Sequence, residues 1–299
     1  MFSSFTEIER YLIDQKIKKR IVLCGARDDI AMNAIVRGKR NGFVDAILIG
    51  DQEEAAALLR TLGEDPSDYR IVHEPRELRA ARLAIQMVTS GEADIPMKGL
   101  VQSASYLMAI KNPCGGLLDA GGMLNEATAF YYTEQHRIIV AGDCAINIAP
   151  TLEEKAAILA NLIPLARVFN GGETVKAALV SVLEKPDPTI PSSVEAEKLA
   201  AMDWGEGAIV EGPFGLDNAL DAEAARHKGI ASPVAGHADV LLMPDIHAGN
   251  VFHKCVHFFG HMPFASVTCG TRTPVIFNSR TDDANSKYNS IMTAILQSL

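Results

Sequence analysis

The sequence predicts an α/β protein built around parallel sheet. Short apolar runs alternate along the chain with longer stretches of helical periodicity, and this alternation is its dominant pattern. The runs are continuously apolar, as expected of strands that are buried on both faces. The predicted strands are Ile21–Cys24, Ala46–Ile49, Ile138–Ala141, Ala177–Val182, Val240–Met243 and Pro274–Phe277. The clearest predicted helices are Asp28–Arg37, Glu53–Leu62, Arg76–Ser90, Leu152–Phe169, which Thr151 is suited to cap, and Asn285–Leu299.

The composition is that of a soluble globular protein. Hydrophobic residues make up 48% and charged residues 22% of the 299 positions, which is ordinary for such proteins. No apolar run approaches the roughly 18–20 residues that a membrane helix needs. The segment Met1–Arg20 is polar and amphipathic and has no apolar core, so we expect neither a signal peptide nor a membrane partner.

Cysteine usage and net charge predict a cytoplasmic protein that does not bind nucleic acid. The five cysteines are scattered, odd in number and without a C-x-x-C pair, which favours reduced thiols. The formal net charge of −9 disfavours nucleic acid, because phosphate backbones are bound by basic surfaces. An acidic protein can still bind a small anion where lysine and arginine side chains converge.

The most informative segment follows the predicted strand Val240–Met243. It continues through Asp245 to the pair Gly249 and Asn250, and Lys254 comes four residues later. This pattern is typical of a strand that runs through a tight loop into a helix start, where backbone N–H groups bind anions. These four residues are therefore candidate substrate-binding residues, although a helical lysine is also often just solvated.

Two further strand ends carry candidate binding residues. Asp143 and Asn147 lie in the polar loop Gly142–Asn147, at the end of a predicted strand, where open α/β sheets bind ligands. They are suited to orient a substrate or, alternatively, to brace the loop. Lys98 lies in the string Pro96–Gly99, between a strand candidate and a helix, and is a candidate contact for a phosphate group or a surface lysine.

The segment Asn278–Asp283 combines groups that suit acyl-phosphate chemistry. Arg280 offers a planar fork for phosphate. The hydroxyl of Ser279 can donate to a tetrahedral oxyanion, which contributes roughly 3 kcal/mol in known cases. Asp282 or Asp283 can accept a thiol proton. Plain helix capping is the alternative for all of these residues.

Two other signals are weak. His253, His257 and His261 are spaced four apart, but Pro263 weakens the helix there and no carboxylate follows in zinc-like spacing, so we expect no metal. Cys144 has no histidine near it in sequence, so we do not expect a covalent acyl-enzyme. The signatures of dinucleotide-binding proteins, P-loop NTPases and serine hydrolases are absent.

These motifs closely resemble the phosphate acetyltransferase and phosphate butyryltransferase family, which moves an acyl group between coenzyme A and inorganic phosphate. The resemblance covers nearly the whole chain and looks closest to the butyryl branch. It is carried by the segments Ser232–Lys254, Gly142–Thr151, Asn278–Asp283, Glu184–Pro188 and Glu211–Ala219.

The resemblance implies two doubly wound α/β domains with a cleft between them, of the isocitrate-dehydrogenase-like type. Residues 1–147 and 268–299 would form the first domain, and residues 148–267 a second domain that dimerises. A homodimer or higher homo-oligomer is therefore expected. One continuous sheet is the alternative on the sequence alone.

The resemblance also implies direct transfer, in which acyl-CoA and phosphate give acyl phosphate and free CoA, with no metal and with coenzyme A as substrate rather than cofactor. Arg280, assisted by Lys254 and the Gly249–Asn250 loop, would hold phosphate. Ser279 would stabilise the oxyanion, and Lys98 would contact phosphate or CoA.

The general base is the point of departure from the family. Acetyl-specific members place an aspartate seven residues after the serine of the Ser-Arg pair, where this chain has Ser286. Asp282 and Asp283 are the expected substitutes, as in the butyryl branch. The alternatives are a phosphate acyltransferase that acts on acyl carrier protein, a non-catalytic CoA-binding protein and, with less support, an NAD-dependent dehydrogenase.

Overall fold

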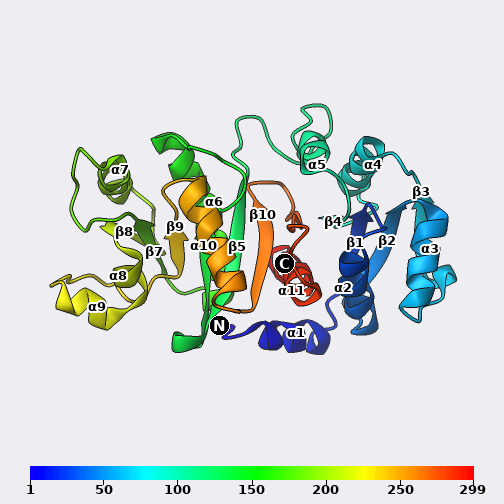
Figure 1. Ribbon diagram of the computed structural model, residues 1–299, viewed down its shortest axis with the longest axis horizontal. Coiled ribbons are helices and arrows are strands. Elements are labelled where there is room, and N and C mark those ends of the chain that lie inside the picture. Colours follow the sequence, from blue (N-terminus) through cyan, green and yellow to red (C-terminus); the bar gives the residue numbers. More distant parts are fainter. The chain divides into compact units, whose positions relative to one another are not determined.

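A computed structural model describes residues 1–299, which divide into two compact units (Figure 1). Unit 1 comprises residues 1–4 and 123–264, and unit 2 comprises residues 5–122 and 265–299. The sequence placed domain boundaries after residues 147 and 267. That division into folding domains stays a prediction, whereas the boundaries of the two units fall after residues 4, 122 and 264.

Unit 2 contains a parallel sheet with the strand order β3-β2-β1-β4. The strands are β1 (Lys19–Cys24), β2 (Val44–Gly50), β3 (Arg70–His73) and β4 (Ile95–Lys98). The chain moves outward from β1 to β3 and then returns to the other side of β1 for β4. The carboxyl ends of β1 and β4 therefore flank a topological switch point, where ligands bind in open α/β sheets.

Helices connect and cover these strands. They are α1 (Phe5–Asp14), α2 (Asp29–Arg40), α3 (Gln52–Thr61), the 3₁₀ helix η1 (Pro66–Asp68), α4 (Glu77–Thr89), α5 (Ser103–Ile110) and the C-terminal α11 (Ala284–Gln297). Aspartates cap α2 and α3, because Asp28 accepts from the backbone N–H of Ala31, and Asp51 from that of Glu54. The C-terminal helix α11 packs on α1 and α2, so the chain's end belongs to this unit.

The five strands within unit 1 lie in the order β5-β6-β9-β7-β8. They are β5 (Asn125–Tyr132), β6 (Arg137–Gly142), β7 (Val175–Val180), β8 (Ala208–Phe214) and β9 (Val240–Leu242). All neighbours are parallel except β5 and β6. A sixth strand, β10 (Phe264–Cys269), begins at the last residue of unit 1 and continues in unit 2.

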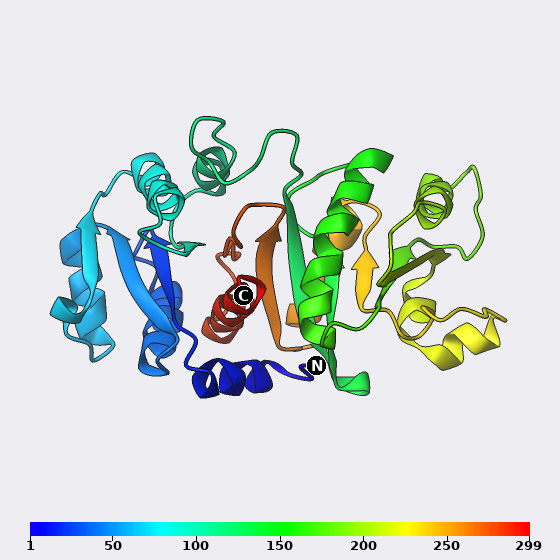
Figure 2. The same ribbon diagram turned by 180° about the vertical axis from the view of Figure 1, so that it is seen from behind.

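Helices cover both faces of the unit 1 sheet. They are α6 (Leu152–Asn170), α7 (Pro191–Ala200), α8 (Leu216–Leu220), α9 (Ala222–His227) and α10 (Ile246–Phe258), with a 3₁₀ turn η2 (Thr133–Gln135). In Figure 1, α10 lies in front of the sheet, and the reverse view in Figure 2 shows α6 on its other face. The predicted cap Thr151 forms a full capping box with Glu154. No helix has both the length and the apolar character to cross a bilayer.

Two strand predictions need correction. The sheet of unit 1 is not purely parallel: β5 and β6 are joined only by Thr133–His136, and so short a connection permits an antiparallel hairpin but no parallel crossover. The predicted strand Pro274–Phe277 is wrong as a continuous strand. It makes only isolated bridges, from Val275 to Thr268 and from Ile276 to Met97, because Pro274 has no N–H to donate.

Candidate active site

In unit 1, the structure brings together the two strand ends that the sequence singled out. The strands β6 and β9 are neighbours, with Gly142 opposite Leu242. The loop after β6 therefore lies against the start of α10, where the amide of Asn250 donates to the carbonyl of Cys144 at 3.1 Å. Gly249 makes this approach possible, because a Cβ atom there would lie 2.1 Å from the carbonyl oxygen of Asp143.

The carboxylate of Asp143 braces its own loop. It accepts hydrogen bonds from the backbone N–H groups of Glu126, Ala145, Ile146 and Asn147, at 2.8–3.2 Å, and from the side-chain amide of Asn147 at 2.5 Å. Its side chain is buried, which raises the pKa of Asp143, while the bonds to backbone N–H groups act in the opposite direction. Of the two roles predicted for Asp143 and Asn147, these contacts directly support loop bracing.

The beginning of α10 presents groups that can bind an anion. Asp245 is its N-cap and accepts from the backbone N–H of Ala248 at 2.9 Å. Lys254 lies one turn beyond Asn250 on the same helix and is partly exposed. The helix start offers both backbone N–H groups and a positive dipole end, which together favour negatively charged ligands.

In unit 2, backbone pairing places Lys98 beside the Ser-Arg segment. The N–H of Lys98 donates to the carbonyl of Ile276 at 2.9 Å, and the N–H of Ile276 donates to the carbonyl of Pro96 at 3.0 Å. Lys98 is the last residue of β4, and Ser279 follows only three residues after Ile276. Two predicted site segments thus lie at the same edge of the unit 2 sheet.

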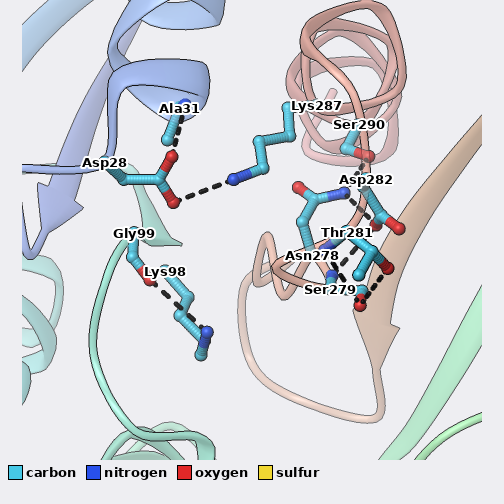
Figure 3. Close-up of polar contacts among 10 residues, drawn as sticks. All are labelled: Asp28, Ala31, Lys98, Gly99, Asn278, Ser279, Thr281, Asp282, Lys287 and Ser290. Carbon is cyan, nitrogen blue, oxygen red and sulfur yellow. Dashed lines mark hydrogen bonds and ion pairs between the residues drawn. The ribbon is translucent and has the colours of Figure 1, made fainter.

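The Ser279 turn is closed by Asp282. The buried carboxylate of Asp282 accepts from the backbone N–H of Ser279 at 2.9 Å and from the amide of Asn278 at 3.3 Å (Figure 3). The Asn278 amide also donates to the hydroxyl of Ser290 at 3.0 Å, which ties the turn to α11. The hydroxyl of Ser279 lies 3.0 Å from that of Thr281.

Asp283 and Arg280 occupy the outer side of this turn. Asp283 is the N-cap of α11 and accepts from the backbone N–H of Ser286 at 2.7 Å. Both Asp283 and Arg280 are exposed, in contrast to the fully buried Asp282. Among the carboxylates of this segment, Asp283 is therefore the one that solvent and a ligand can reach.

Lys98 is buried without a carboxylate partner. The residue is 3% exposed, and its ammonium lies 3.4 Å from the carbonyl of Gly99 and 5.7 Å from the ring centroid of Phe277. Burial lowers the pKa of Lys98, and the nearby charges of Arg280 and Lys287 lower it further. Burying an ammonium that has no carboxylate partner costs free energy. Such an arrangement is expected where an anionic ligand supplies the missing negative charge.

Sequence reasoning missed Asp28 and Lys287. The ammonium of Lys287 lies 2.8 Å from the carboxylate of Asp28, and both side chains are buried (Figure 3). The sequence placed Asp28 only as the first residue of the predicted helix Asp28–Arg37, whereas the structure makes it the N-cap of α2. Lys287 was visible only as a lysine in the predicted C-terminal helix, and the burial of residues 286–296 is a finding of the structure.

The histidines of α10 and Cys144 have packing roles. His253 and His257 pack on the ring of Phe264, with centroids 5.1 and 5.0 Å apart. No group of three or more His, Cys, Asp or Glu residues is arranged to hold a metal ion. Cys144 is buried, and burial raises the pKa of its thiol well above the ordinary value, so the nucleophilic thiolate is disfavoured.

The comparisons with known proteins agree on one family. Residues 53–295 match the family described as "Phosphate acetyl/butaryl transferase". The phosphate butyryltransferase of Clostridium acetobutylicum is 37% identical, over 99% of this chain and 98% of the relative. The phosphate acetyltransferase of Thermotoga maritima is 34% identical, over 91% of this chain and 93% of the relative.

Solved structures show the same fold. The crystal structure of a branched-chain phosphotransacylase from Enterococcus faecalis matches with a TM-score of 0.84 and 28% identity, over 94% of this chain and 99% of that one. A phosphotransacetylase from Streptococcus pyogenes matches with a TM-score of 0.81 and 22% identity, over 99% of both chains. The predicted α/β fold class is thereby confirmed.

Proposed function

Because the chain belongs to the phosphate acetyl/butaryl transferase family, we propose that it transfers a short-chain acyl group between coenzyme A and inorganic phosphate. Acyl-CoA and phosphate give acyl phosphate and free CoA, reversibly. The observation that carries the proposal is the likeness to a phosphate butyryltransferase over almost the full length of both chains. That likeness also supports butyryl, or a group of similar size, as the acyl chain.

The residues of unit 2 supply the groups that this transfer needs. An oxygen of phosphate attacks the thioester carbonyl, whose oxygen becomes a tetrahedral oxyanion, and the carbon–sulfur bond then breaks to release CoA thiolate. Arg280 and Lys98 bind phosphate, and the hydroxyl of Ser279 donates to the oxyanion. In the reverse direction, the exposed carboxylate of Asp283 takes the thiol proton, while the buried Asp282 holds the turn.

The residues of unit 1 supply a second set of anion-binding groups. The α10 start, with Gly249 and Asn250, and Lys254 one turn later would bind phosphate or the phosphate groups of CoA. Asp245 caps this helix, and Asp143 with Asn147 holds the neighbouring loop. The proposal includes no metal and no further cofactor, and coenzyme A is a substrate.

The test is phosphate-dependent release of CoA from butyryl-CoA. Ser279→Ala is expected to lower kcat about 100-fold or more, as the loss of one oxyanion donor does elsewhere. Arg280→Ala is expected to raise KM for phosphate. Arg280→Lys keeps the positive charge but lacks the bidentate fork of arginine. If both alanine variants retained most of their activity, the assignment of Ser279 and Arg280 to the active site would be wrong.

The acyl donor is tested with a substrate panel. It contains acetyl-, propionyl-, butyryl- and isobutyryl-CoA, and butyryl-acyl carrier protein. Turnover is expected with the CoA thioesters, with its maximum at the four-carbon groups. Turnover with the carrier-protein thioester alone would overturn coenzyme A as the substrate, and CoA binding without any turnover would indicate a non-catalytic protein.

We also propose a cytoplasmic homodimer or higher homo-oligomer. The exposed apolar side chains of Val251, Phe258 and Phe259 on and just after α10 support self-association. The five cysteines are all free, which supports a reducing compartment. Light scattering coupled to size exclusion is expected to give at least twice the monomer mass, and a monomer at micromolar concentration would contradict the assembly.

A further inference from the structure

Two contacts hold the ammonium of Lys98 in unit 2. The first is a long hydrogen bond of 3.4 Å to the carbonyl of Gly99 (Figure 3). The second is with the ring of Phe277, because the ammonium lies over this ring, 5.7 Å from its centroid. The negative face of an aromatic ring attracts a cation within about 6 Å. Since the hydrogen bond is long, the ring of Phe277 supplies much of what stabilises the charge of Lys98.

The contact between Lys98 and Phe277 is formed away from water. Lys98 is buried, and burial lowers the pKa of its ammonium. Burial therefore favours the neutral amine, which cannot attract phosphate. A cation–π contact favours the charged form, and it is stronger where the cation has lost its water. The ring of Phe277 thus opposes the effect that burial has on Lys98.

The ring of Phe277 is itself supported from α5. Tyr106 stacks on it, with the ring centroids 5.9 Å apart and 23° between the ring planes. Tyr106 is fully buried, and its hydroxyl has no hydrogen-bond partner. Because a buried hydroxyl without a partner costs free energy, the contribution of Tyr106 to this site comes from its ring and not from its hydroxyl.

Phe277 also joins the two segments of unit 2 to which we assign phosphate binding. It follows Ile276, which forms a bridge with Met97 next to Lys98. It precedes the Ser279 turn, in which Arg280 lies three residues beyond Phe277. A contact between this ring and the Lys98 ammonium therefore fixes the position of one cation relative to the turn that carries the other.

We propose that Phe277 is a positioning residue for phosphate binding: its ring, supported by Tyr106, holds the Lys98 ammonium charged and in place beside the Ser279 turn, where it binds a phosphoryl dianion. The inference rests on the phosphate acyl transfer proposed above and adds to it a residue that acts through Lys98. Lys98 touches the phosphate, whereas Phe277 and Tyr106 do not.

Stepwise fluorination of Phe277 tests the electrostatic role of the ring. Fluorine withdraws electron density from the ring face and changes its shape little, so mono-, di- and trifluorophenylalanine weaken the attraction progressively. KM for phosphate is expected to rise with each fluorine, to about 10-fold above the wild type in the trifluoro variant, while KM for butyryl-CoA changes little. A ring that only fills space gives no such progression, and a KM for phosphate that stays constant or falls along the series overturns the inference.

Ordinary substitutions test the same role by a second route. Phe277→Leu keeps an apolar side chain without a ring and is expected to raise KM for phosphate about 10-fold. Phe277→Tyr keeps the ring and is expected to retain the KM of the wild type, as is Tyr106→Phe, which keeps the stack and removes only the unpartnered hydroxyl. Equal increases in Phe277→Leu and Phe277→Tyr would contradict the role of the ring.

Phe43 provides the matched control in the same unit. It is fully buried and packs on Tyr288 with the ring centroids 5.7 Å apart, much as Phe277 packs on Tyr106. The cations that lie over aromatic rings in this unit contact Tyr288, Tyr69 and Phe277, and not Phe43. Fluorination of Phe43 is therefore expected to leave KM for phosphate unchanged, and an increase as large as that for Phe277 overturns the inference.

Direct binding of phosphate separates this inference from the proposed reaction. Isothermal titration calorimetry with inorganic phosphate, without any thioester, is expected to give a Kd that rises along the Phe277 series. If no CoA thioester turns over while Kd follows the series, the proposed reaction fails and the role of Phe277 stands. If CoA thioesters turn over while Kd and KM for phosphate stay constant along the series, the role of Phe277 fails and the reaction stands.

Discussion

Asp282 and Ser279 are joined by two hydrogen bonds of opposite direction. The carboxylate of Asp282 accepts from the backbone N–H of Ser279 at 2.9 Å, and the backbone N–H of Asp282 donates to the carbonyl of Ser279 at 3.2 Å. These bonds close the turn that carries the Ser279 hydroxyl and the Arg280 side chain. The buried carboxylate therefore positions the residues to which we assign contact with substrate.

This relationship predicts different effects for two substitutions of Asp282. Asp282→Ala opens the turn and is expected to lower kcat/KM about 10- to 100-fold, because misplaced groups lose much of their effect. Asp282→Asn keeps an oxygen for the Ser279 N–H and is expected to retain most activity. If steady-state kinetics show equal losses of kcat/KM in both variants, the charge of Asp282 takes part directly in the reaction. Our assignment of Asp283 as the base is then wrong.

Asp283→Asn separates capping from proton transfer. Asparagine caps a helix about as well as aspartate, so the free energy of unfolding measured in urea is expected to stay within about 0.5 kcal/mol of wild type. The loss of the proton acceptor is expected to lower kcat with acyl phosphate and CoA about 100-fold or more. A variant with nearly normal kcat would show that another group accepts the thiol proton.

Cys144→Ala is expected to remain active. The thiol is buried and its pKa is raised, and direct transfer needs no acyl-cysteine. Intact-protein mass spectrometry after mixing with butyryl-CoA is expected to show no added acyl group in the wild type. A folded but inactive Cys144→Ala variant, or an acyl group found on the wild-type protein, would support transfer through an acyl-cysteine.

Lys98→Met is expected to stabilise the free protein. Burial lowers the pKa of Lys98 in the folded state. Between this lowered pKa and the ordinary pKa near 10.4, the unfolded state therefore binds more protons than the folded state. The free energy of unfolding of the wild type consequently rises with pH over this range. At neutral pH, the variant is expected to gain about 1–3 kcal/mol in the free energy of unfolding. That gain should shrink as the pH rises through this window.

The thermal stability of the protein in the presence of phosphate tests whether Lys98 binds phosphate. Inorganic phosphate is expected to raise the thermal midpoint of the wild type, because a ligand that binds only the folded state stabilises it, and to do so far less for Lys98→Met. Lys111→Met, at an exposed lysine of the same unit, is the control and should respond as the wild type does. Equal phosphate responses in all three proteins would show that Lys98 does not bind phosphate.

Local features of the fold could be predicted from the sequence. The strand Ile21–Cys24 lies within β1, the helix Leu152–Phe169 corresponds to α6, and Thr151 caps that helix as expected. Asp143 and Gly249 were both selected as candidates because they follow strands. Periodicity and capping depend on neighbours within one or two turns, and a single stretch of sequence contains all of them.

Only the tertiary structure decided which distant residues meet. Asp28 and Lys287 are 259 positions apart, and their contact depends on how α11 packs against α2, which no local pattern encodes. The same holds for the bridge from Met97 to Ile276, which brings Lys98 to the Ser279 turn, because neither segment by itself indicates that the two pair. The sequence by itself therefore determined the elements and the residue types at their ends. Chain topology decided which of these ends share an edge, because strand order and helix packing arise from the burial of the whole core.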